Sequence, residues 1–192
     1  MNTRDKILES ARLLFIKHGL EGVKMQMVAD EAGVNKGLLH YYYKSKAKLF
    51  TEVFSIVFNN VLKDVKSLFA DDSMSPDEKI SKIVDTYFKL LNKNKEMPVF
   101  FISEMNRDPG LLKRLDYGNK VKSLMESART IIPIDKPPEF ITHFIITLIS
   151  LCVFPFMARP LLNEITEDEK LTEVLLNDRK EFVKTTLKNM IK

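Results

Sequence analysis

Residues 33–46 read GVNKGLLHYYYKSK and carry the strongest local signal in this chain of 192 residues. The stretch has three consecutive tyrosines and three lysines, with Lys48 just beyond it, and it contains no acidic residue. Gly33 can adopt the positive φ that a tight turn requires, and apolar residues on both sides of it recur at helical spacing. The sequence therefore predicts two helices, over about residues 25–32 and 36–43, joined by a turn at 33–35 in a helix-turn-helix pattern.

The apolar residues of this pattern fall on one side of each predicted helix. Val28, Ala29 and Ala32 recur at helical spacing in the first helix, and Ala29 is small where the two helices would cross. Leu39 in the second helix can pack against a preceding helix, which is predicted over about residues 3–18. The residues left near the surface at the start of the second helix are Asn35, Lys36, Gly37, Leu38, His40 and Tyr41.

These surface residues suit a DNA groove. An α-helix fits the major groove, and the N-terminal residues of the second helix in a helix-turn-helix usually meet the base edges. Lys36 can donate to guanine, and Leu38 can lie against a thymine methyl group. The hydroxyls of Tyr41 and Tyr42 can reach phosphates, whereas Tyr43 is expected to be a core residue.

The distribution of charge points to an anionic partner for this segment alone. Residues 1–50 contain nine Lys or Arg and five Asp or Glu, whereas residues 51–192 contain 21 of each, so the net charge of +4 belongs to the first quarter of the chain. Lys46 and Lys48 fall in the first turn of the next predicted helix, which Ser45 can cap. Cations there oppose the helix dipole, and a bound phosphate would relieve this by accepting the free N–H groups.

The rest of the chain is also predicted to be helical, which makes the protein all-α with about nine helices. SPDE at 75–78 and TEDE at 166–169 have the form of capping boxes, and each is expected to open a helix. DPG at 108–110 opens a helix expected to run to about residue 132, and KPP at 136–138 precedes the next. The change in composition near residue 48 predicts a DNA-binding domain over 1–48 and a second helical domain over 49–192.

Several classes of enzyme and metal site lack their sequence signatures. His18, His40 and His143 lie far apart, and no HExxH, CxxC, GxGxxG, P-loop or GxSxG spacing occurs. We therefore expect no enzymatic activity, no metal and no cofactor. Cys152 is the single cysteine and cannot form an internal disulfide, and the first apolar run contains acidic residues, unlike a signal peptide. These features predict a cytoplasmic protein.

Residues 140–158, FITHFIITLISLCVFPFMA, contain no Asp, Glu, Lys or Arg and reach the nominal length of a membrane span. His143, Pro155 and three hydroxyl side chains interrupt the run, and no other segment resembles it. A helix that is apolar all round is also found in a protein core or a subunit interface, and that interpretation is favoured here over a membrane span. The alternative is a helical adaptor that binds a membrane surface without DNA specificity.

The stretch ILESARLLFIKHGLEGVKMQMVADEAGVNKGLLHYYYKSKAKLF, residues 7–50, resembles the N-terminal DNA-binding region of the TetR/AcrR family of transcriptional regulators. The resemblance implies a homodimer that binds double-stranded operator DNA, most often as a repressor, and dimerises through its last two helices. Transferred by position, it implies DNA contacts at Lys24, Gln26, Asn35, Lys36, Gly37, Leu38, His40, Tyr41 and Lys46. Lys24, Leu38, His40 and Lys48 depart from residues common in the family, so no operator sequence is implied.

The resemblance also implies that the C-terminal helices bind a small ligand. They are rich in Phe and Met, and an apolar pocket with a few polar groups suits a small hydrophobic molecule. The same residues can simply fill the core, which is the more frequent role of Phe and Met. The candidate ligand contacts are Phe58, Tyr87, Phe88, Phe101, Glu104, Met105, His143, Phe144 and Thr147.

Overall fold

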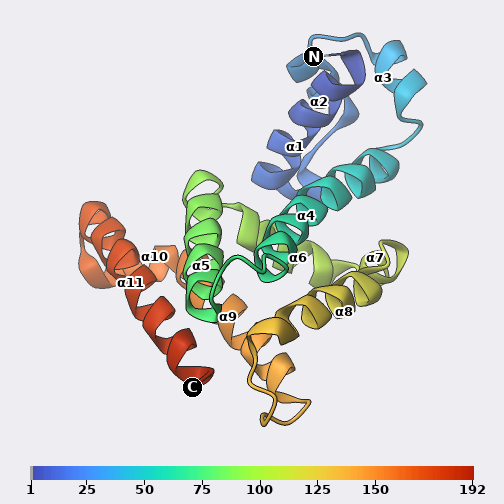
Figure 1. The fold of residues 1–192 in the computed structure, drawn as a ribbon. Coiled ribbons are helices and arrows are strands. Elements are labelled where there is room, and N and C mark those ends of the chain that lie inside the picture. The colour runs from blue at the N-terminus through green and yellow to red at the C-terminus, as the bar shows by residue number, and fades with distance from the viewer. Residues whose placement is uncertain (1) are drawn as a thin grey trace. The chain divides into compact units, whose positions relative to one another are not determined.

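The computed structural model describes residues 2–192, and over this range the chain forms eleven α-helices and one 3-10 helix, without a strand (Figure 1). The all-α prediction is confirmed. The elements, in chain order, are α1 (Thr3–Gly22), α2 (Met25–Ala32), α3 (Lys36–Tyr42), α4 (Lys46–Phe69), α5 (Pro76–Lys93), α6 (Met97–Arg107), α7 (Pro109–Arg114), α8 (Tyr117–Ala128), η1 (Arg129–Ile131), α9 (Phe140–Met157), α10 (Arg159–Thr166) and α11 (Glu169–Met190).

The two helices beyond the predicted nine come from two breaks that the prediction did not include. The helix expected over 109–132 is divided into α7 and α8 at Asp116, which has a positive φ of 54°. The apolar helix that begins near residue 140 ends at Met157, and Pro160 lies in the first turn of a separate α10. Proline is well tolerated in a first turn because its missing N–H has no helical partner there.

The chain divides into two compact units. The first comprises the described residues up to Val61 together with Val99–Asp116, and so includes α1 to α3, the first part of α4, most of α6, and α7. Its core is aromatic: the ring of Phe15 meets that of Phe50 edge to face at 5.2 Å between centroids, and Phe50 meets Phe100 at 5.9 Å. Such edge-to-face pairs contribute beyond the area that they bury, and they join α1, α4 and α6.

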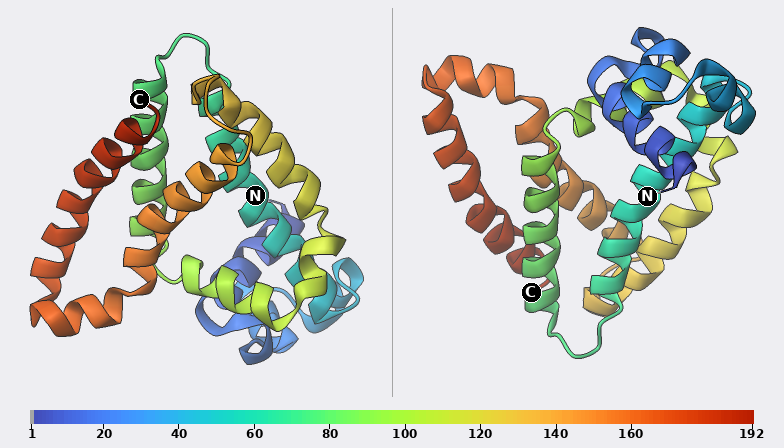
Figure 2. Two further views of the ribbon diagram at one scale, coloured as in Figure 1. Left: turned by 90° about the horizontal axis from the view of Figure 1, so that it is seen from below. Right: turned by 90° about the horizontal axis from the view of Figure 1, so that it is seen from above.

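The second unit comprises Leu62–Pro98 and Tyr117–Lys192. Helices α5, α9 and α11 pack against one another, and α10 joins α9 to α11 at the end away from the C-terminus (Figure 2). The rings of Phe88 in α5 and Phe156 in α9 lie 5.4 Å apart in an edge-to-face contact. Ser75 and Glu78 form the predicted capping box at the start of α5, with both reciprocal bonds present.

A buried lysine at the start of α5 binds the end of α4. Lys79 is 4% exposed, and its Nζ donates to the carbonyl oxygen of Phe69 at 2.8 Å and to the hydroxyl of Thr130 at 3.4 Å. Phe69 is the last residue of α4, so a positive charge lies where the helix dipole is negative. This contact fixes the C-terminal end of α4 within the second unit.

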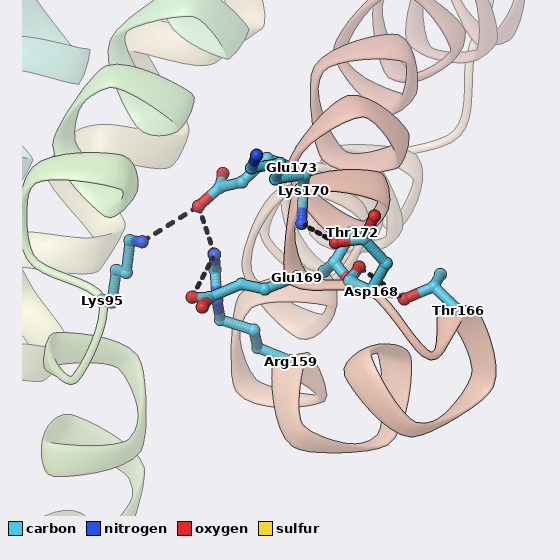
Figure 3. Close-up of polar contacts among 8 residues, drawn as sticks. All are labelled: Lys95, Arg159, Thr166, Asp168, Glu169, Lys170, Thr172 and Glu173. Carbon is cyan, nitrogen blue, oxygen red and sulfur yellow. Dashed lines mark hydrogen bonds and ion pairs between the residues drawn. The ribbon is translucent and has the colours of Figure 1, made fainter.

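The predicted capping box at TEDE does not form. Thr166 is the last residue of α10, and Glu167 takes a left-handed conformation that turns the chain before α11 begins. Asp168 therefore caps α11, accepting a bond from the N–H of Lys170 at 2.8 Å (Figure 3). Thr166 instead shares a hydrogen bond with Thr172, 2.7 Å between the two hydroxyl oxygens.

A network of charged side chains joins α10 and α11 to the connection between α5 and α6 (Figure 3). Arg159, at the start of α10 and largely buried, pairs with Glu173 of α11 and lies 3.7 Å from Glu169. Lys95, in the connection before α6, also binds Glu173, at 2.9 Å. By length and composition, helix α9 could cross a membrane, but core helices of soluble proteins can be equally long and apolar.

Candidate DNA-binding surface

The turn between α2 and α3 has the geometry that its sequence predicts. Gly33 adopts the left-handed conformation, with φ 64° and ψ 36°, and the N–H of Val34 donates to the carbonyl of Ala29 at 3.0 Å. The side chain of Asn35 caps α3 by accepting from the N–H of Leu38 at 2.8 Å. These bonds satisfy the ends of both helices and hold α3 in a defined direction from α2.

The buried and exposed sides of this hairpin separate as expected. Val28, Ala29 and Leu39 are fully buried, and Tyr43 is a core residue, whose pKa is raised mainly by burial and further by the charge of Glu52. The predicted base and phosphate contacts of α3 are all exposed. This exposed set comprises Asn35, Lys36, Gly37, Leu38, His40, Tyr41 and Tyr42.

Tyr41 is the most exposed of the α3 aromatics. The residue is 72% exposed, and its ring meets the ring of Tyr42 edge to face, with 5.4 Å between centroids. The hydroxyl of an exposed tyrosine can bind a phosphate, and its ring face can stack on a base. The surface therefore combines one lysine, one histidine and two phenols in the first two turns of α3.

The flanking candidates differ in how far they are engaged within the protein. Lys24 is exposed just before α2, and Gln26 is exposed but donates its amide to Asp30 at 2.7 Å. Lys48 is exposed in the first turn of α4, where its N–H donates to Ser45 Oγ at 3.2 Å, which is the predicted cap. Lys46 is half-buried, and its Nζ donates to the carbonyl of Leu20 at 2.9 Å.

The structure distributes the candidate ligand residues between the two units. Phe58, Phe101, Glu104 and Met105 lie in the first unit; Tyr87, Phe88, His143, Phe144 and Thr147 lie in the second. Within the first unit, the rings of Phe58 and Phe101 are 5.9 Å apart. A groove of about 290 Å³ between α1 and α4 is lined by other residues, including Leu8, Val53, Ile56 and Val57.

The candidates of the second unit differ sharply in exposure. Phe144 is fully buried, Tyr87 and Phe88 are buried, and Thr147 is half-buried, whereas His143 is exposed on α9. Burial raises the pKa of the Tyr87 hydroxyl well above its ordinary range and raises the pKa of the nearby Cys152 thiol to about 12. Both groups therefore stay neutral at physiological pH. No group of three or more potential metal ligands occurs among residues 2–192.

Helices α9, α10 and α11 carry many apolar side chains that the single chain leaves exposed. On α11 they fall on one side of the helix by their spacing, and Phe182 is 60% exposed. For α9, the sequence pattern alone could not distinguish the exposed face from the buried one, because the helix is apolar all round. The exposed set comprises Ile146, Ile149 and Phe154 on α9, Leu161 and Ile165 on α10, and Leu171, Val174, Leu175 and Phe182 on α11.

Comparison with known proteins identifies relatives of both the N-terminal segment and the whole chain. A family model described as bacterial regulatory proteins, tetR family, matches residues 7–53. The probable HTH-type transcriptional regulator YttP of Bacillus subtilis is 25% identical over 170 residues, which cover 86% of this chain and 82% of YttP. The HTH-type transcriptional repressor KstR2 of Mycolicibacterium smegmatis is 26% identical over 104 residues, 54% of this chain and half of KstR2.

The fold is also similar to that of solved structures over its full length. The crystal structure of a TetR transcriptional regulator from Legionella pneumophila aligns with a TM-score of 0.73 and 20% identity, covering 100% of this chain and 98% of that one. The match of the family model spans the helix-turn-helix and the start of α4. YttP and KstR2 both carry the names of transcriptional regulators and not of enzymes.

Proposed function

The chain belongs to the TetR family of bacterial transcriptional regulators, and we propose from this that it binds a palindromic DNA operator as a homodimer and represses transcription until a small apolar ligand releases it. The observation that carries the proposal is the exposed side of α3, which begins at a capped N-terminus and presents Lys36, His40 and Tyr41 without any acidic residue. Residues 1–48 are the proposed DNA-binding domain, and residues 49–192 the ligand-binding and dimerisation domain.

We assign the DNA contacts by the chemistry of each exposed group. Lys36 reads guanine in the major groove, and Leu38 packs against a thymine methyl group. Tyr41 and Tyr42 bind phosphates, while the backbone at Gly37 allows close approach to the DNA. The remaining proposed contacts are Lys24, Gln26, Asn35, His40, Lys46 and Lys48. Lys46 has a second task, because its bond to Leu20 also holds the end of α1.

The exposed apolar residues of α9, α10 and α11 support dimerisation through the C-terminal helices. Soluble monomers rarely leave large contiguous apolar surface exposed, and obligate dimer interfaces resemble a core divided between two subunits. Leu171, Val174, Leu175 and Phe182 recur at helical spacing on α11, and Ile146, Ile149 and Phe154 do so on α9. A second copy of the chain would cover both faces and bring two recognition helices to successive major grooves.

We propose that the ligand is small and hydrophobic, and that it binds within the second unit, where Tyr87, Phe88, His143, Phe144 and Thr147 are the candidate contacts; Phe58, Phe101 and Met105 of the first unit are the alternative set. It would favour a conformation whose two recognition helices have the wrong separation for the operator. DNA affinity then falls by the ratio of the ligand's affinities for the two conformations. Repression, as opposed to activation, is supported by the name of KstR2, which is a transcriptional repressor. A DNA partner implies that the protein acts in the cytoplasm.

Selection from a random duplex library tests the proposal. We expect a palindromic site that the wild type binds in fluorescence anisotropy, with affinity that falls steeply as salt is raised. Lys36→Ala should cost about 1–3 kcal/mol and relax the preference at one base position. Lys46→Ala should weaken binding to all duplexes and flatten the salt dependence.

The proposed function would be contradicted if the selection enriched no site at low salt, even after the protein had been unfolded and refolded to remove any copurified ligand. Selection of a site that Lys36→Ala binds with unchanged affinity and preference would instead contradict only the placement of α3 in the groove. A control variant, Lys122→Ala, removes an exposed lysine of α8 and should leave both properties unchanged.

A further inference from the structure

A single buried carboxylate joins α6 to the end of α1 within the first unit. Glu104 lies in α6 and is 5% exposed. Its Oε1 accepts from the backbone N–H of Leu20 at 2.8 Å, and its Oε2 accepts from Arg107 Nε at 2.8 Å and Nη2 at 2.6 Å. Arg107 also lies 3.6 Å from Glu21, so that two neighbouring residues of α1 are engaged from α6.

The backbone that receives this carboxylate is bent. Gly19 leaves the helical conformation, with φ 66° and ψ 177°, inside the range of α1. A side chain at this φ is strained, and a Cβ added to Gly19 would lie 3.2 Å from Glu104 Oε1. The bend therefore turns the N–H of Leu20 toward α6 and leaves room for the carboxylate that accepts from it.

The other side of the same peptide segment is held by α4. The carbonyl of Leu20 accepts from Lys46 Nζ at 2.9 Å, so both backbone polar groups of Leu20 are bound by charged side chains. Charge-assisted hydrogen bonds are stronger than neutral ones, and a buried carboxylate that lost its donors would be costly to keep. Leu20 lies five residues before Met25, where α2 begins. Its position thus sets where the recognition hairpin starts.

We propose that Glu104 is a positioning residue for DNA recognition, which fixes the bend at Gly19 and Leu20 and so makes the orientation of α2 and α3 depend on the position of α6. The sequence suggested Glu104 as a ligand contact, whereas its bonds within the first unit give it this different role. A displacement of α6 would break the bond to Leu20 and free the hairpin to reorient. This role rests on the proposed DNA-binding function.

Three substitutions of Glu104 separate the bond from general stability. Glu104→Gln keeps an oxygen that can accept from Leu20 but loses the charge that binds Arg107. Glu104→Asp keeps the charge but withdraws the carboxylate by one methylene group, and Glu104→Met removes every acceptor. Glu96→Gln and Glu96→Met are matched controls, because Glu96 is exposed immediately before α6.

The measurement is the affinity of full-length protein for the selected duplex and for a scrambled duplex, together with hydrogen exchange of residues 19–24. We expect Glu104→Met to lower specific affinity at least tenfold, to leave binding to the scrambled duplex unchanged, and to raise exchange at Leu20. Glu104→Asp should show a smaller loss of the same kind. Glu104→Gln should retain most of the specific affinity, which a merely destabilising change would not predict.

The order of outcomes decides between the explanations. Failure of the wild type to select any site overturns the proposed function before Glu104 is tested. A wild type that binds, with all three variants binding equally well, overturns the positioning role. If Glu104→Met does not fold, Glu104→Asp and Glu104→Gln decide alone. The positioning role would be overturned if both had the same ratio of affinities for the selected and the scrambled duplex as the wild type.

Discussion

Asn35 caps α3 and is also a proposed DNA contact, and substitution can separate the two roles. Its side-chain oxygen caps the helix by accepting from the N–H of Leu38 at 2.8 Å, and the residue is also a proposed DNA contact. Asn35→Ala removes the cap and adds no charge. Asn35→Asp keeps the acceptor and places a negative charge at the surface proposed to face phosphates. The two variants should therefore rank in opposite order for helix stability and for DNA affinity.

The magnitudes follow from one hydrogen bond and one charge. Loss of an N-cap costs about 1 kcal/mol, and because α3 has only seven residues this should raise its local opening roughly fivefold. Aspartate is as good a cap as asparagine, and its charge at a helix N-terminus adds about 0.3–1 kcal/mol of stability. A carboxylate about 6–8 Å from a phosphate is repelled by roughly 2–3 kcal/mol at an effective dielectric constant of about 20, or roughly 30- to 100-fold in affinity.

Hydrogen exchange of residues 38–42 and anisotropy with the selected duplex measure the two effects separately. We expect faster exchange in Asn35→Ala, exchange as slow as wild type in Asn35→Asp, and the larger loss of DNA affinity in Asn35→Asp. The loss in Asn35→Asp should shrink as salt is raised. Asn60→Asp on α4 is the control for net charge. Wild-type exchange in the alanine variant would refute the cap, and wild-type affinity in the aspartate variant would refute the orientation of α3.

Three further predictions concern the second unit. Phe182→Glu should raise the dimer dissociation constant at least tenfold in sedimentation, at a cost of about 2 kcal/mol, and an unchanged dimer would exclude this face of α11 from the interface. Lys79→Met should lower the free energy of unfolding by about 1–2 kcal/mol in urea titration, because its bonds to Phe69 and Thr130 are lost; an increase would mean that burial of the ammonium outweighs those bonds. Since burial raises the pKa of Cys152 to about 12, only about one thiol in ten thousand is ionised at pH 8, and a thiol reagent should react with the native protein only as pH approaches 12 or after unfolding. Rapid reaction at pH 8 would place Cys152 outside the core.

The helix-turn-helix could be predicted from the sequence because its determinants are local. Gly33 supplies the turn, Asn35 caps the next helix three residues before its bonding partner, and Leu39 falls on the buried side by helical spacing. The capping box at Ser75 was predicted for the same reason. The capping box predicted at Thr166 was wrong. Its residues have the right spacing, but the left-handed conformation of Glu167 turns the chain between Thr166 and the start of α11. A local pattern succeeds where no backbone reversal intervenes.

The C-terminal helices could be predicted as helices but not assigned their faces. Phe144 and Phe154 are both apolar residues of α9, yet the first is fully buried and the second is exposed. Helical spacing gives the same pattern for a core residue and for an interface residue, because both are apolar for the same reason. The distinction depends on which neighbouring helix covers each side, and here α5, α8, α10 and α11 contact α9 but leave part of it exposed.

Glu104 illustrates why the functional surface cannot be derived from its own segment alone. A buried glutamate needs a partner for its charge, and Glu104 on α6 is 5% exposed. The partner proves to be the backbone of Leu20, 84 residues away, and it is available only because Gly19 bends α1. The side chains of α3 indicate what the surface can bind. Under the proposed positioning role of Glu104, the orientation of α3 depends on the backbone N–H of Leu20, which no sequence pattern reveals. Reading the proposed operator would require both the α3 side chains and their orientation, so we expect a change in α6 to alter DNA recognition without changing any proposed DNA contact.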